Sequence, residues 1–149
     1  MNDDFLELND LDWFAVFNDG LLAHFATGGR GVVPEMIRES ISNYEMAYDY
    51  FYSLSDSCEY EVVEENVPVF NTEAQRDRYV QSFAIMARKG LFSYDICDFG
   101  YKLIALPKKG RKSSELPLGI KEVLYRIPAK CFDNDIKCIK IPLGDVGGL

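Results

Sequence analysis

Two apolar segments, at about residues 13–17 and 21–26, lie close together near the beginning of the chain. Asn18-Asp19-Gly20 joins them, and an Asx-Gly sequence between apolar runs is a strong hairpin signal. We therefore expect a β-hairpin here. Because side chains alternate along a strand, His24 is predicted to share a face with Leu22 and Ala26.

A second hairpin is predicted further along the chain. Residues 91–97 and 101–106 are two apolar segments joined by the short glycine-containing turn Asp98-Phe99-Gly100. Residues 136–141 alternate in part and predict a last strand near the C-terminus. Two hairpins and a C-terminal strand together predict an antiparallel sheet.

Apolar residues then recur at helical spacing between the two hairpins. Pro34 is well placed as the first residue of a helix. After it, an apolar stripe with spacings of four, three, four and three predicts a helix over about 35–54, formed by Ile37, Ile41, Tyr44, Tyr48 and Phe51.

A second helix is predicted over about 73–89. Thr72 and Gln75 have capping-box spacing, and Lys89 followed by Gly90 is a good helix end. A short helix is expected near residues 119–125. The 149 residues are thus expected to form one α+β domain, spanning 1–149, in which the sheet packs against two main helices.

The charge is distributed unevenly along the chain. The formal net charge is −8; residues 1–80 carry −13 and residues 81–149 carry +5. Binding nucleic-acid phosphate requires cations, so this balance argues against a nucleic-acid partner and favours a basic protein. The apolar runs are too short to span a membrane, and the acidic N-terminus does not look like a signal peptide. We expect a cytoplasmic protein without membrane contact.

The acidic side chains are densest in residues 59–65, which carry no motif and which we call the acidic segment. We expect it to be a connecting loop or an edge strand, because Pro68 follows. It is either a solvated face or a docking surface for a partner. Two tyrosines off the helical stripe are candidate interface anchors. The candidate partner-binding residues are Tyr50, Tyr52, Asp56, Glu59, Glu61, Glu64 and Glu65.

No motif in the sequence specifies a reaction, a metal or a cofactor, and none is expected. The four cysteines and single histidine have no familiar zinc spacing, and we expect reduced thiols. Histidine is the residue type that ordinarily changes charge near neutral pH, so His24 is the candidate base, and Cys97 would need such a base to act as a nucleophile. The Gly28-Gly29-Arg30-Gly31 turn precedes a helix start and could hold an anion, but it lacks the usual phosphate-binding pattern.

The first hairpin also carries a resemblance. Asp12-Trp13-Phe14-Ala15-Val16, followed by Asp19-Gly20, Ala23-His24-Phe25, Gly28-Gly29 and Val33-Pro34, resembles a pattern in small bacterial immunity-type proteins of polymorphic toxin systems. The resemblance covers residues 12–34, and Phe17-Asn18 departs from it where an acid is common. It implies a small acidic α+β protein that blocks a cognate toxin domain, and it assigns no catalytic residues.

The predicted function is therefore non-enzymatic: a module whose acidic surface covers the cleft of a basic toxin domain. The alternative is a small enzyme or ligand-binding domain that uses His24, Cys97 and the Gly28–Gly31 turn. A homodimer is a further possibility that the sequence leaves open.

Overall fold

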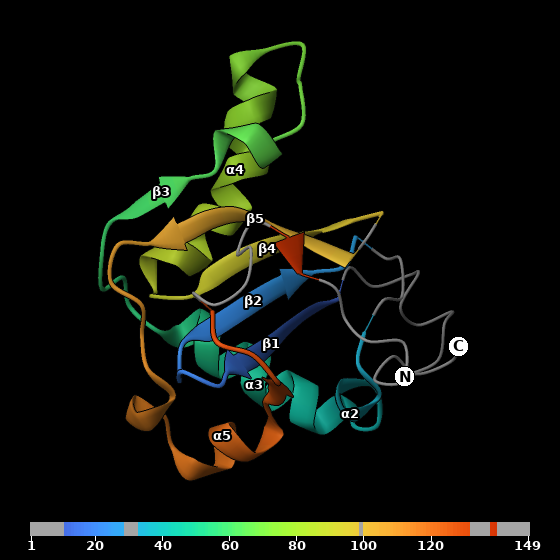
Figure 1. Ribbon diagram of the computed structural model, residues 1–149, viewed down its shortest axis with the longest axis vertical. Helices are drawn as coiled ribbons and strands as arrows, with labels where there is room; N and C mark the ends of the chain where they lie inside the picture. Colours follow the sequence, from blue (N-terminus) through green and yellow to red (C-terminus); the bar gives the residue numbers. More distant parts are fainter. Residues whose placement is uncertain (1–10, 29–32, 99, 132–137, 140–149) are drawn as a thin grey trace.

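A seven-stranded mixed sheet forms the centre of the protein in the computed structural model, which describes residues 11–28, 33–98, 100–131 and 138–139 (Figure 1). The strand order is β3-β5-β4-β2-β1-β6, and β7 pairs with β5 beside this path. The strands are β1 (Asp12–Phe17), β2 (Leu22–Ala26), β3 (Tyr60–Val62), β4 (Phe92–Cys97), β5 (Gly100–Pro107), β6 (Tyr125–Ile127) and β7 (Cys138–Ile139).

Both predicted hairpins are confirmed. β1 pairs antiparallel with β2, and β4 pairs antiparallel with β5. Gly20, with φ at 84°, takes the left-handed conformation that the first turn requires. Of the predicted C-terminal strand, Cys138–Ile139 pairs antiparallel with β5, and its other residues lie outside the described ones.

The expectation of an antiparallel sheet is wrong in one respect. The two hairpins join through β2 and β4, which are parallel, and β1 is parallel to β6, a strand that the sequence did not predict. The physical reason is the connection between β2 and β4. It contains the main helices, and such a crossover returns the chain to the same end of the sheet, which makes the two strands parallel.

The helix expected over 35–54 is two helices, α2 (Glu35–Arg38) and α3 (Ile41–Ser53). The helix is interrupted at Ser40, which has an extended backbone. The Ser40 hydroxyl accepts a hydrogen bond from Asn43 N, so Ser40 is the N-cap of α3. The expected stripe is also incomplete: Ile41 is 42 % exposed, whereas Ala47 and Phe51 are buried.

The second main helix, α4 (Glu73–Arg88), agrees with the prediction. Thr72 caps it by accepting a hydrogen bond from Gln75 N, and Gly90 follows its end with φ at 93°. A short α5 (Leu118–Val123) forms near the expected place. The described residues also form two 3-10 turns, η1 (Glu64–Asn66) and η2 (Ser113–Glu115).

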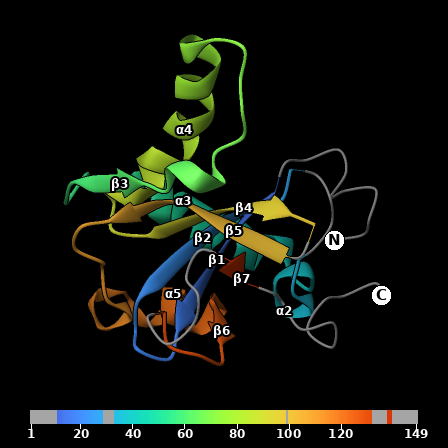
Figure 2. The same ribbon diagram turned by 45° about the horizontal axis from the view of Figure 1, so that its top comes forward.

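The alternation of side chains in the sheet divides the core into two faces. Trp13 and Phe25 stack at 4.3 Å on one face, where Tyr94 and Tyr101 join them. Phe14 and residues of α3, α4 and α5 form the other face, and Figure 2 shows α3 and α5 near the β1–β2 hairpin. His24 lies on this helix-covered face, because Phe14 is its cross-strand partner, and it shares the face with Leu22, as the alternation predicted. The α+β class, with a sheet packed on two main helices, is confirmed.

Part of the acidic segment forms β3, the strand at one end of the order of the sheet. Among the described residues, β3 pairs with β5 alone, so Glu61 lies in an edge strand, which was one of the two predicted alternatives. The turn η1 follows β3. Within the described ranges, no helix has the length and apolar character needed to cross a membrane.

Candidate functional site

Seven carboxylates are exposed on one continuous stretch, residues 56–77, which we call the acidic projection. They are Asp56, Glu59, Glu61, Glu64, Glu65, Glu73 and Asp77. With Arg76 as its single base, the stretch has a formal charge of −6. It contains β3, η1 and the first part of α4, and Figures 1 and 2 show α4 and the loop before it extending away from the sheet.

Part of this charge is balanced within the chain. Lys108 Nζ lies 3.6 Å from Glu59 Oε2, and the Arg76 guanidinium pairs with Glu64. The hydrogen bond to Glu64 is the main reason that the pKa of Arg76 is raised. Exposed ion pairs of this kind contribute little to stability and can rearrange when a partner arrives.

The loop before α4 adds an apolar side chain to the projection. Val69 is fully exposed, and Phe70 packs against Tyr79 of α4 with ring centroids 5.3 Å apart. A hollow of about 420 Å³ runs along this loop beside Glu64 and Arg76. Sequence reasoning did not single out Val69, because an apolar residue in a Val-Pro-Val segment looks like part of a strand.

The two candidate tyrosine anchors have contacts of their own in α3. Tyr52 donates a hydrogen bond of 2.8 Å to Asp12 Oδ2 and stacks on Tyr48 at 4.3 Å. Tyr50 is half-buried and packs edge-on against Phe51. Tyr52 therefore takes part in a polar network under the helix, and its ring is only 37 % exposed.

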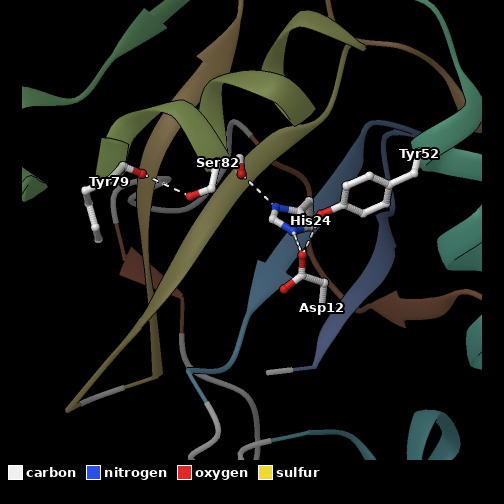
Figure 3. Close-up of polar contacts among 6 residues, drawn as sticks. Asp12, His24, Tyr52, Tyr79 and Ser82 are labelled. Carbon is white, nitrogen blue, oxygen red and sulfur yellow. Dashed lines mark hydrogen bonds and ion pairs between the residues drawn. The ribbon is translucent and has the colours of Figure 1, made fainter. Parts of the chain in front are cut away.

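That network is centred on His24 (Figure 3). His24 Nε2 lies 3.0 Å from Asp12 Oδ2, and His24 Nδ1 lies 2.7 Å from Ser93 Oγ. The strands supply this arrangement: Ser93 is directly opposite His24 on parallel β4, and Asp12 is two residues before His24's partner on β1. His24 is 2 % exposed and Ser93 is fully buried.

The protonation of the network follows from Asp12. Burial raises the pKa of this carboxyl, but attraction to His24 and hydrogen bonds from His24 and Tyr52 outweigh burial and bring the pKa below its ordinary value of 3.8. An ionised carboxylate only accepts hydrogen bonds, so Nε2 of His24 carries a proton. Nδ1 then accepts from the Ser93 hydroxyl when the ring is neutral.

Burial, together with the negative charge of Asp12, also raises the pKa of two tyrosines of α3. Burial and then the nearby Asp12 charge raise the pKa of Tyr44 to about 12. Burial, the Asp12 charge and the hydrogen bond to Asp12 raise the pKa of Tyr52 further. Both phenols therefore stay protonated at neutral pH and remain hydrogen-bond donors.

Asp12, His24 and Ser93 are the residue types of a hydrolytic triad, but the geometry does not present a nucleophile. Ser93 has no exposed surface and does not line the neighbouring cavity. A serine nucleophile must reach a substrate carbonyl, with donors for the oxyanion close by. The bonds to Ser93 are better explained as satisfying a buried imidazole.

A cavity of about 250 Å³ opens beside this network. Its lining comes from β1, β2, the turn after β2, β4 and α4 and consists of Asp12, His24, Ala26, Gly28, Tyr79, Ser82, Phe83 and Asp95. Tyr79 donates a hydrogen bond of 2.5 Å to Asp95 Oδ2, and Ile96 N donates one to Asp95 Oδ1. Burial raises the pKa of Asp95 more than these bonds lower it.

The structure separates the residues of the alternative hypothesis. Gly28 joins His24 at the cavity, but Gly29, Arg30 and Gly31 lie outside the described residues. Cys97 is four residues beyond Ser93 along β4, which is about 13 Å at the strand rise of about 3.3 Å per residue. His24 therefore has a serine beside it, where that hypothesis required the thiol of Cys97.

Asp95 and Tyr79 were not identified from the sequence, because their place at the cavity depends on long-range packing. Among the residues that the structure describes, no three histidine, cysteine, aspartate or glutamate side chains lie close enough to hold a metal ion.

Comparisons with known proteins add no family or fold relative. No protein-family model matches the chain, and no curated protein or solved structure shows significant similarity to it.

Proposed function

We propose that this chain is a non-enzymatic protein-binding module that docks a basic partner through the acidic projection. The observation that carries the proposal is the exposure of all seven carboxylates on one continuous stretch, whose last part, the loop before α4 and the start of α4, extends away from the sheet. The resemblance of residues 12–34 to immunity-type proteins supports a bacterial toxin domain as the partner, and inhibition by covering its cleft as the mechanism.

The physics of association suits such a surface. A single-sign field speeds the encounter with an oppositely charged protein, and the effect falls as salt shortens the Debye length to about 8 Å under physiological conditions. Charge alone gives little lasting affinity, which usually comes from a few desolvated apolar anchors. Val69, fully exposed beside the acidic side chains, is the anchor that the projection offers.

Surface plasmon resonance tests the proposal, with the product of a neighbouring toxin-like reading frame as the immobilised partner. The variant is Asp56→Lys combined with Glu61→Lys, because both side chains are exposed and their reversal breaks none of the described ion pairs. The matched control is Glu122→Lys, an exposed acid on α5 outside the projection.

We expect the double reversal to lower the association rate about tenfold or more at low salt, since steering by charge has that magnitude. The control should change it by less than about twofold. Equal association rates for the wild type and the double variant, or no binding by the wild type, would overturn the proposal.

A further inference from the structure

The cavity beside His24 has a one-sided electrostatic character. Two carboxyl groups line it from the strands on either side of β2, Asp12 on β1 and Asp95 on β4. Its described lining residues include neither lysine nor arginine, and Lys102, the partner of Asp95 on β5, is near enough to offset part of the rise that burial causes in the pKa of that carboxyl. With both carboxylates ionised, the formal charge is −2 with neutral His24 and −1 with protonated His24. The described lining residues are therefore negative in either form of the imidazole.

The lining also leaves acceptor capacity on Asp12. Both bonds that the described residues make to this carboxylate end on Oδ2, from His24 and Tyr52. In Figure 3 the second carboxylate oxygen of Asp12 points away from both of these donors. His24 and Tyr52 thus fix the orientation of the carboxylate, and no described residue donates a hydrogen bond to its second oxygen.

Aromatic rings form the wall on the α4 side. Tyr79 and Phe83 lie one helical turn apart with ring centroids 5.1 Å from each other, and Phe83 also lies 6.4 Å from the His24 ring. Aromatic faces attract organic cations through their quadrupole, and carboxylates beside them add the opposite charge. This combination of groups is typical of sites that bind ammonium or guanidinium.

The volume limits the size of the ligand. Pockets for drug-sized molecules measure about 300–1,000 Å³, so a cavity of about 250 Å³ suits one small charged group with a short apolar stem. A bare metal ion fits less well, because the described residues bring no three metal-ligating side chains together.

We propose that this cavity binds the ammonium or guanidinium group of an organic cation, which is either a free small molecule or a lysine or arginine side chain of another protein. Asp12 and Asp95 hold the charge, and Tyr79 and Phe83 cover the stem. This inference does not depend on the acidic projection, which is a different surface of the chain.

The test uses probes of one shape and different charge. Butylammonium and butylguanidinium are titrated into the full chain, with butanol as the neutral control and butyrate as the anionic control. Amide signals in two-dimensional NMR report the site, since Ala26, Gly28 and Asp95 line the cavity. Blocked arginine, with both backbone ends capped, distinguishes a protein side chain from a free small molecule.

We expect both cations to shift the three amide signals saturably, while butanol and butyrate do not. Tighter binding of blocked arginine than of butylguanidinium would assign the site to a protein side chain, and the reverse to a free cation. Asp95→Asn should weaken the cations about tenfold, whereas Asp49→Asn, an exposed acid on α3, should leave them unchanged.

Three outcomes would overturn the proposal. They are cation binding weaker than about 10 mM, equal shifts with butanol, and an unchanged affinity in Asp95→Asn. The asparagine keeps the shape of the side chain, and the spectrum of the variant itself shows whether it is folded.

Discussion

Replacing Asp12 with alanine tests the buried network most directly. The variant removes the acceptor of both His24 Nε2 and the Tyr52 hydroxyl. His24 is 2 % exposed, and a buried donor left without a partner costs about 1–3 kcal/mol. Tyr52 is 37 % exposed and can turn to water, so it adds little.

The Asp12 side chain is itself 21 % exposed, so water can reach part of the space that it leaves. We therefore expect the lower part of the range, a loss of about 1–2 kcal/mol in the free energy of unfolding. At about 2–4 °C per kcal/mol for a chain of this size, the midpoint of thermal unfolding should fall by about 2–8 °C.

Urea unfolding followed by tryptophan fluorescence is a suitable assay. Trp13 is the single tryptophan of the chain, it is 1 % exposed, and it donates a hydrogen bond to Tyr101, so its emission reports the core. Asp49→Ala, an exposed acid on α3, is the control and should change stability by less than about 0.5 kcal/mol.

The effect should also depend on pH. The folded pKa of Asp12 lies below its ordinary value of 3.8, so its contribution is fully present above that value and is lost as the pH falls through the lowered pKa. The difference between the wild type and Asp12→Ala should thus shrink on going from neutral pH to about pH 3. A loss no larger than that of Asp49→Ala at neutral pH would refute this account of the network.

Three further predictions concern other parts of the chain. Gly90→Ala should lower the free energy of unfolding in urea by about 1–3 kcal/mol, because φ of Gly90 is 93° and an added Cβ would lie 2.8 Å from Arg111 Cβ. Gly119→Ala, in α5 with nothing within 4 Å of an added Cβ, should raise it by about 0.5–1 kcal/mol. Equal effects of the two substitutions would contradict this reasoning. Asp95→Asn should raise the free energy of unfolding at neutral pH by about 0.5 kcal/mol. A carboxyl with a raised pKa favours folding when it is protonated and loses that contribution as the pH rises through the folded pKa, so the gain from asparagine should vanish near pH 4. A loss of stability at neutral pH would contradict this prediction. Val69→Ser should leave the unfolding midpoint unchanged but speed dissociation from the partner about tenfold, and an unchanged dissociation rate in surface plasmon resonance would remove Val69 as an anchor.

The elements that local chemistry determines were predictable from the sequence. The turn residues at Asn18-Asp19-Gly20 fixed the first hairpin, and the Thr72 cap with Gly90 bounded α4. The break at Ser40 was missed because the apolar spacing continues across it. The parallel pairing of β2 with β4 was missed because a long crossover sets it, and no local pattern records that pairing.

The residues of the candidate site also fall into those that a local pattern indicates and those that depend on long-range packing. His24 was singled out because it is the single histidine. The hairpin register already implies that Asp12 lies on its face, since Asp12 pairs with Ala26 and Phe14 with His24. Ser93 and Asp95 depend on the β2–β4 register, so the sequence did not indicate them. Tyr52 was named as an interface anchor, but its hydrogen bond to Asp12 depends on helix packing and was not predicted.

A protection assay in cells tests the central proposal most directly. Cells that express a neighbouring toxin-like gene are complemented with the wild-type chain, with the Asp56→Lys and Glu61→Lys double variant, or with the Glu122→Lys control. Binding through the acidic projection predicts that the wild type and the control restore growth and that the double variant, shown to be folded by its Trp13 emission, does not. Equal protection by all three chains, or protection by none, would contradict it.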